Sequence, residues 1–218
     1  FFAPKIINLR PPNGGAGTST CPVAQGAPDM VADALAASGS AVRVLRPALC
    51  RHEETTLDGL AFWRELVALA RDLATASTSP AGAAAAELQL APAVRRALRA
   101  GLAHQARFEE GLAAIGRGAV EYAAAEGRPV VVVCGETHVI HEPLFDCGVG
   151  EIAAANGALA VPVACYPVPA GVPGLGRVHW ASAGQTLRGV VAGPATGDPF
   201  PLLVAPPACR PTPFVQPV

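Results

Sequence analysis

Short apolar runs alternate with longer amphipathic stretches along this chain. The runs at residues 5–9, 41–45, 130–134, 159–163 and 200–205 are too short for helices and predict strands. Between them, apolar residues recur every three or four positions, or end at a Gly or Asn stop signal, which predicts helices. These predicted helices cover Pro28 to Gly39, Leu57 to Ser77, Ala91 to Ala125, a stretch from Leu144 to Gly157, and Val178 to Val191. The alternation predicts an α/β fold.

The run Val130–Cys134 is apolar at every position, which is typical of a central parallel strand with both faces covered. Gly135 ends it, a polar loop is expected from Glu136 to Pro143, and a helix and the strand at 159–163 follow. This order predicts a right-handed βαβ unit, which places ligands in the loop beyond the strand's carboxyl end. The loop from Gly135 to Asp146 is therefore the first place to expect a binding site.

We predict two Rossmann-like lobes with parallel sheets, bridged by a helical segment. Residues 1–56 belong to the first lobe, 57–126 to the bridge and 127–218 to the second lobe. Within the bridge, the stretch S-T-S-P-A-G-A-A-A-A-E predicts a linker of low complexity. The long helix after it contains four glycines that are expected to kink or break it: Gly101, Gly111, Gly116 and Gly118.

Composition excludes several classes of partner. With 51% apolar and 15% charged residues the chain can bury a core, and 16 basic against 17 acidic residues argue against nucleic acid or an anionic membrane surface. No apolar run approaches the length of a membrane span. Phe1 is not a start methionine and the chain begins in a strand-like run, so we expect a piece of a longer protein. Six cysteines without a C-x-x-C pair indicate a cytoplasmic protein with unbridged or metal-bound thiols.

Two cysteines lie in loops beside strand ends. Cys21 follows a glycine-rich loop and precedes a helix start, where backbone N–H groups favour a thiolate, and Cys209 follows the last strand. Thiolates from the two lobes could share an iron–sulfur cluster, and small buried loop cysteines are the alternative. Cys134 and Cys165 end apolar strands and read as inert. Cys147 is a spare ligand at a helix entry, and Cys50 is either structural or a ligand.

The loop after the central strand carries E-T-H-V-I-H, with Glu136, His138 and His141. These side chains could bind zinc or iron or exchange protons near neutral pH, and a solvated histidine pair is the alternative. Asp146, Gly148 and Gln185 lie at helix starts, where either capping and packing or cleft lining would explain them. No Walker loop or dinucleotide fingerprint is present.

Several motifs occur in one order over nearly the whole chain. They are C-P-V-A-Q-G-A-P-D-M-V, V-R-V-L-R-P-A-L, A-H-Q-A-R-F-E-E-G-L-A-A-I-G-R, the pair G-E-T-H and E-P-L-F-D-C-G-V, H-W-A-S-A-G-Q-T-L, and P-A-C-R-P-T-P-F. Together they resemble the activase-related proteins of the 2-hydroxyacyl-CoA dehydratase system, in which a dehydratase-subunit-like region is often joined to an actin-like ATPase activator.

This resemblance implies a 4Fe-4S cluster used for low-potential electron transfer or for dehydration of an acyl-CoA. It implies Cys21 and Cys209 as ligands, with Cys147 or Cys50 in place of a third ligand expected upstream of Phe1. Gly135, Asp146, Gly148 and Gln185 would line the cleft. The implied partners are an acyl-CoA, a redox protein, and an actin-like ATPase domain in the same or a separate chain.

The chain departs from the family pattern at the loops. Glu136 and Thr137 stand where the family has Arg-Pro, Asp146 where it has Asn, and residues 210–213 read Arg-Pro-Thr-Pro in place of Gly-Pro-Asp-Ser. Two alternatives therefore remain: a cluster-less binding or scaffolding module of the same fold, and a metal-dependent hydrolase using Glu136, His138 and His141.

Overall fold

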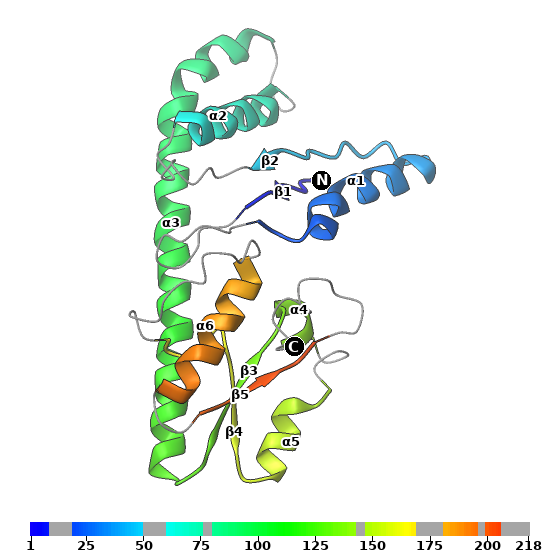
Figure 1. The fold of residues 1–218 in the computed structure, drawn as a ribbon. Helices are drawn as coiled ribbons and strands as arrows, with labels where there is room; N and C mark the ends of the chain where they lie inside the picture. The colour runs from blue at the N-terminus through cyan, green and yellow to red at the C-terminus, as the bar shows by residue number, and fades with distance from the viewer. Residues whose placement is uncertain are drawn as a thin grey trace. The chain divides into compact units, whose positions relative to one another are not determined.

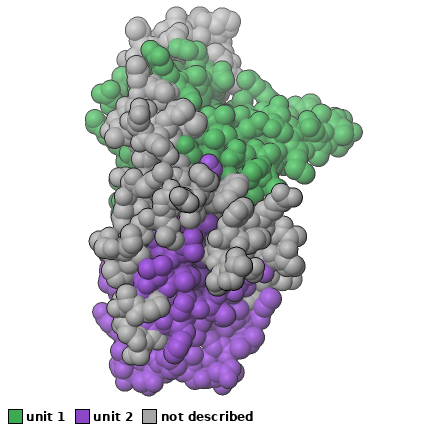
Figure 2. Space-filling model, in the orientation of Figure 1, with its two compact units in different colours: residues 1–9, 20–107 green, residues 10–19, 108–218 purple. Residues whose placement is uncertain are grey.

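The structure, a computed structural model, describes residues 1–8, 19–49, 60–75, 80–142, 147–168, 181–195 and 199–205. Helices and strands alternate through these segments, and their order confirms an α/β fold (Figure 1). The chain divides into two compact units, which are Phe1–Leu9 with Thr20–Arg107 and Arg10–Ser19 with Phe108–Val218 (Figure 2). The long helix α3 contributes to both units.

Unit 1 contains a small parallel sheet covered by one helix. Strand β1 (Lys5–Ile6) pairs with β2 (Ala48–Leu49), and a single bridge joins Phe2 to Leu45. The strand expected at 41–45 is therefore wrong in extent, because regular pairing begins only after Pro47, whose carbonyl accepts a hydrogen bond from the Lys5 N–H at 2.8 Å. Helix α1 (Pro22–Ala37) contacts β1.

The start of α1 corrects a second prediction. The helix begins at Pro22, six residues before the expected start, and Pro28 lies inside it. Pro22 sits in the first turn, where a proline loses no intrahelical hydrogen bond and its fixed φ suits a helix. Pro28 is buried within the helix and does not mark the start of α1. The predicted stop was right, because the helix ends at Ala37 with Ser38 as its C-cap, and Gly39 has a left-handed φ of 72°.

Two further helices follow in the sequence, α2 (Leu60–Thr75) and α3 (Pro80–Ala125). The predicted linker is helical from Pro80 onward, because an alanine-rich segment after a proline has high helix propensity. The four glycines do not end α3.

Helices α2 and α3 contact each other. The Arg95 guanidinium of α3 lies 5.5 Å from the ring centre of Trp63 in α2, a cation–π contact. An apolar groove of about 370 Å³ lies between the two helices, lined by side chains such as Leu66, Leu73 and Leu98.

Unit 2 is built on a three-stranded parallel sheet in the order β4-β3-β5. Strand β3 (Val130–Cys134) is central, as its uniform apolarity predicted, between β4 (Leu159–Pro162) and β5 (Phe200–Leu203). Helix α6 (Ala181–Ala195) contacts β3 and β5, and α5 (Val149–Ala155) contacts β4. The core contains Val132, Cys134 and Val161, together with Ala123 of α3 and Ala192 of α6.

Close helix packing in unit 2 depends on two glycines. A Cβ on Gly116 of α3 would lie 1.7 Å from the Cys165 carbonyl oxygen, and a Cβ on Gly189 of α6 would lie 2.3 Å from Val163 Cγ2. Neither position has room for a side chain. Gly116 therefore lets α3 approach the backbone after β4, and it does not break the helix as expected.

The loop after β3 also differs from its prediction. Residues expected to form a polar loop include a short helix, α4 (Thr137–Ile140), whose Val139 side chain is buried. An apolar residue pointing inward gives this turn a packing contact. Within the described segments, no helix has the length and apolarity needed to cross a membrane.

Candidate functional site

Cys21 lies just beyond the carboxyl end of β1, at the N-terminus of α1. It is the N-cap residue, with φ −58° and ψ 129°, and its side chain makes no capping hydrogen bond. The residue is half-buried and forms no disulfide. Backbone N–H groups of a first helical turn have no intrahelical acceptor and carry the positive end of the helix dipole. Cys21 therefore stands at the end of α1 where these N–H groups have no intrahelical acceptor.

Thr20 and Gln25 hold the turn between β1 and α1 in place; we call this turn, residues 20–25, the Cys21 corner. The Thr20 N–H donates to the Ile7 carbonyl at 3.0 Å, and its hydroxyl donates to the Ile6 carbonyl and to the Ile7 carbonyl at 3.3 Å. The Gln25 amide nitrogen donates to the carbonyls of Ile7 at 3.2 Å and Thr20 at 3.0 Å. Gln25 comes one helical turn after Cys21, so its side chain can reach back across the turn. The pair fixes the Cys21 backbone to the end of β1.

Gln25 belongs to the C-P-V-A-Q-G motif, but neither its role nor that of Thr20 was predicted from the sequence. The signal for Gln25 was its four-residue distance from Cys21 on the same helix face. Nothing local distinguished Thr20, because its acceptors lie thirteen and fourteen residues earlier in the chain. Gly26 of the same motif has no close contact, since a Cβ there would meet nothing within 4 Å.

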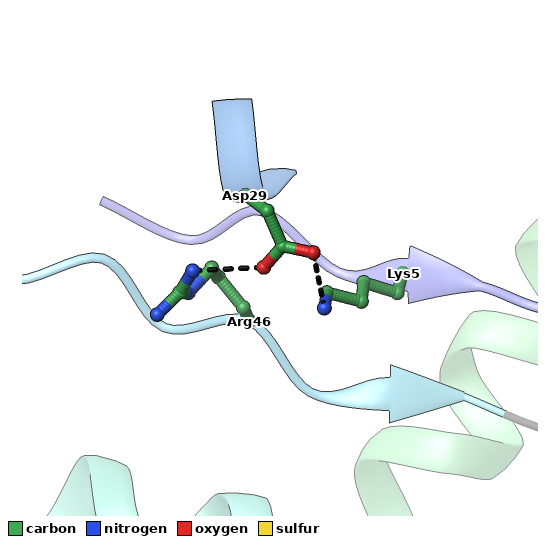
Figure 3. A network of polar contacts seen from close by, with 3 residues as sticks. All are labelled: Lys5, Asp29 and Arg46. Atoms are coloured by element: carbon green, nitrogen blue, oxygen red, sulfur yellow. Dashed lines mark hydrogen bonds and ion pairs between the residues drawn. The ribbon is translucent and has the colours of Figure 1, made fainter. Parts of the chain in front are cut away.

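An ion-pair cluster holds α1 against both strand segments of unit 1 (Figure 3). The Asp29 carboxylate lies 2.6 Å from Lys5 Nζ and 2.8 Å from Arg46 Nη1. The hydrogen bond from Lys5 is the main cause that lowers the pKa of Asp29, and the charges of Lys5 and Arg46 add to it. Asp29 thus links α1 to β1 and to the segment before β2, and it orients the helix whose N-terminus carries Cys21.

The carboxyl end of β3 is packed tightly. Cys134 is fully buried, and burial raises the pKa of its thiol to about 11, so the sulfur is neutral near pH 7. A Cβ on Gly135 would lie 2.5 Å from the Val204 carbonyl oxygen and 3.0 Å from Ile140 Cγ2. The Val204 N–H also donates to the Cys134 carbonyl at 2.8 Å. Gly135 is therefore needed so that the segment after β5 can approach the end of β3. This packing role is separate from the predicted role in lining a cleft.

The polar residues after Gly135 belong to α4. Glu136 is its N-cap and His141 its C-cap, and His138 and His141 are both exposed. Among the described residues, no group of three or more His, Cys, Asp or Glu side chains could hold a metal ion. The structure therefore does not join Glu136, His138 and His141 into such a group.

Some of the remaining candidate residues lie within the described segments and others do not. Cys147 is exposed and, with φ 55°, is followed by Gly148 with φ 65°, so two left-handed residues precede α5. Gln185 is half-buried in α6. Cys165 is half-buried, and burial raises the pKa of its thiol. Asp146, Cys50 and Cys209 lie outside the described residues. The predicted pairing of Cys21 with Cys209 therefore stays a prediction.

Comparison with known proteins assigns the chain to a family. Residues 1–165 match the family model described as "CoA enzyme activase uncharacterised domain (DUF2229)". No curated protein and no solved structure matches the chain. The family match covers the C-P-V-A-Q-G corner, β3 and the loop that follows it, and β4. Since it spans well over half of the sequence, the chain belongs to this family of activase-related domains of CoA enzymes.

Proposed function

We propose that this domain carries an iron–sulfur cluster in a CoA enzyme activase system, with Cys21 as one of its ligands. The observation that carries the proposal is the position of the Cys21 thiol. It lies at the N-terminus of α1, makes no capping hydrogen bond, and belongs to a corner that Thr20 and Gln25 fasten to β1. A cysteine that binds a cluster needs a fixed backbone and a partly exposed side chain, and Cys21 has both.

The donor chemistry of the chain fits such a cluster in part. Cysteine thiolates are the usual ligands of iron–sulfur clusters, and Cys209 with Cys147 or Cys50 would complete the set. The bound cluster would supply one-electron transfer at low potential. Cys134 is a poor donor, because burial holds its pKa at about 11 and keeps the thiol protonated. Of the described cysteines, Cys21 and the exposed Cys147 are the suitable ones.

The finer assignment follows the resemblance to the dehydratase-subunit-like region of activase-related proteins. Under this proposal each parallel sheet belongs to one of the two predicted Rossmann-like lobes, residues 1–56 and 127–218, and ligands bind beyond the carboxyl ends of the strands. The parallel pairing of both sheets supports it, as do Cys21 after β1 and Gly135 after β3. An acyl-CoA or a redox protein would be the partner, together with an actin-like ATPase domain.

The test is metal analysis of anaerobically purified protein. The wild-type chain should contain iron and acid-labile sulfide and absorb broadly in the visible range. Cys21→Ser should lose most of the iron and the visible absorbance, because a hydroxyl is a poor substitute for a thiolate. Cys165→Ser is the matched control and should retain both, since this thiol is half-buried with a raised pKa.

Two results would contradict the proposal. The first is a wild-type protein that is free of iron and cannot be reconstituted, which would favour the cluster-less binding module. The second is a Cys21→Ser protein that keeps its full iron content. Circular dichroism of each variant should match the wild type, so that a loss of iron reports the ligand and not unfolding.

A further inference from the structure

Three large apolar side chains lie exposed along the C-terminal part of α3. Phe108, Ile115 and Tyr122 are 60%, 66% and 51% exposed. They recur every seven residues, and each is followed three residues later by a small one: Gly111, Gly118 and Ala125. Alternate spacings of three and four residues place all six on one side of a helix, as at the a and d positions of a coiled coil. We call these six residues the exposed stripe.

Packing against the described part of the chain does not explain the two glycines of the stripe. A Cβ on Gly111 or Gly118 would meet nothing within 4 Å, whereas a Cβ on nearby Gly116 would clash with the Cys165 carbonyl. Glycine destabilises a helix interior relative to alanine, so two exposed glycines lower the stability of α3 without gaining a contact to a described residue. Large side chains alternating with glycines form the knobs and hollows that a second helix would fill.

We propose that the exposed stripe binds the same stripe of a second copy of this chain, with the two α3 helices antiparallel. In that arrangement each a position faces a d position, so every large side chain meets a small one. Phe108 would face Ala125 of the second copy, Ile115 would face Gly118, and Tyr122 would face Gly111. A parallel pair would instead place large side chains opposite each other and leave the glycines facing glycines.

Charges at the two ends of the stripe favour the same direction. Arg107 borders its N-terminal end, while Glu121 and Glu126 border its C-terminal end, and all three are exposed. Neighbouring antiparallel helices bring the basic end of each stripe beside the acidic end of the other. Parallel helices would bring like charges together. The stripe is therefore complementary to itself in both side-chain size and charge.

The size of the stripe sets the expected affinity. Three partly exposed large residues contribute less than the roughly 800 Å² per partner that stable protein interfaces bury. The dimer should therefore be weak and depend on concentration in the micromolar range or above.

Sedimentation equilibrium of the 218-residue chain over a range of concentrations tests the proposal. The wild type should shift from monomer to dimer as concentration rises. Ile115→Glu should weaken dimerisation at least tenfold, because each copy would bury a charge against the partner helix. Ile152→Glu is the matched control: this residue is 58% exposed on α5, outside the stripe, and the variant should dimerise like the wild type. A wild type that stays monomeric, or an Ile115→Glu variant that dimerises normally, would overturn the proposal.

Three further variants test the packing and the direction of the helices without placing a charge within the stripe. Gly118→Ala should increase helix stability in the dilute monomer and still weaken the dimer, because the new methyl group occupies the space that Ile115 of the second copy needs. Arg107→Glu should weaken the dimer, and adding Glu121→Arg with Glu126→Arg in the same chain should restore it. If Gly118→Ala strengthens association, or if the triple variant fails to recover it, antiparallel pairing through this stripe is wrong.

Discussion

Two side chains explain why Cys21 has a defined position in unit 1, where few of the described residues are buried. Thr20 and Gln25 together donate to three carbonyls at the end of β1 and beginning of α1, so the turn that carries the thiol is fixed by hydrogen bonds more than by apolar packing. Hydrogen bonds of this kind contribute about 1 kcal/mol each. The Cys21 corner is thus held by polar contacts that a single substitution can remove.

At Asp29, the ion pairs predict a pH dependence of stability. Its pKa is lowered in the folded state, so the pairs stabilise the protein above the ordinary value of 3.8 and this contribution is lost as pH falls below 3.8 through the folded pKa. Asp29→Asn should lower the melting temperature at pH 7 by a small amount, since the carboxylate is well exposed. The difference from wild type should shrink toward pH 3.

Thermal unfolding of both proteins across this pH range checks the prediction. Asp33→Asn on the same helix is a suitable control, because the structure shows no ion pair of Asp33 with a described residue. A difference between Asp29→Asn and wild type that stays constant down to pH 3 would mean that the lost ion pairs are not what destabilises the variant.

The cysteines should differ sharply in reactivity. Cys134 is fully buried and its pKa is raised to about 11, whereas Cys147 is exposed. A maleimide should label Cys147 of metal-free native protein at least about tenfold faster than Cys134. Raising the pH to 9 should not change this order, because the Cys134 thiol stays protonated. Mass spectrometry of labelled peptides gives the rates, and equal labelling of Cys134 and Cys147 in native protein would contradict the burial.

At the level of elements, glycines in one helix have opposite roles. Gly116→Ala should destabilise the protein by about 1–3 kcal/mol, because its methyl group would overlap the Cys165 carbonyl and α3 would have to move away from the turn after β4. Gly101→Ala on the same helix meets nothing within 4 Å and should stabilise by up to about 1 kcal/mol.

Urea unfolding of the two variants at low protein concentration measures both effects. The comparison is informative because the substitution is identical and both residues lie in α3. If Gly116→Ala were as stable as Gly101→Ala, the close approach of α3 to the Cys165 backbone would be absent in solution.

Across the whole molecule, burial is uneven between the two units. Unit 2 contains the fully buried Val132, Cys134 and Val161, whereas in the described part of unit 1 Pro28 is the one buried residue. Local stability follows the density of buried contacts. Hydrogen exchange should therefore be slower at the β3 and β4 amides than at those of β1 and β2, by about tenfold or more.

Exchange followed by mass spectrometry on metal-free protein provides the measurement. Repeating it after iron–sulfur reconstitution serves as a comparison, because a cluster held through Cys21 should slow exchange at the start of α1 in particular. Equal protection of both sheets in the metal-free protein would contradict the uneven burial.

The sequence determined those elements whose side chains carry their own signal. Val130–Cys134 was identifiable as a central strand because five apolar residues in a row suit a strand covered on both faces, and Asn156-Gly157 marked the end of α5 because few other residues accept a left-handed turn. The sequence also placed Cys21 ahead of a helix, although it put the start of that helix at Pro28 and the structure puts it at Pro22.

Tertiary structure decided what depends on distant parts of the chain. Helix α1 continues through Pro28, whose ring is buried, and Gly116 is required because a carbonyl forty-nine residues later approaches it. Thr20 acquires its role from β1, thirteen and fourteen residues earlier. Local propensity cannot encode such contacts, since they arise only when separate segments pack together and compete for the same space and the same hydrogen bonds.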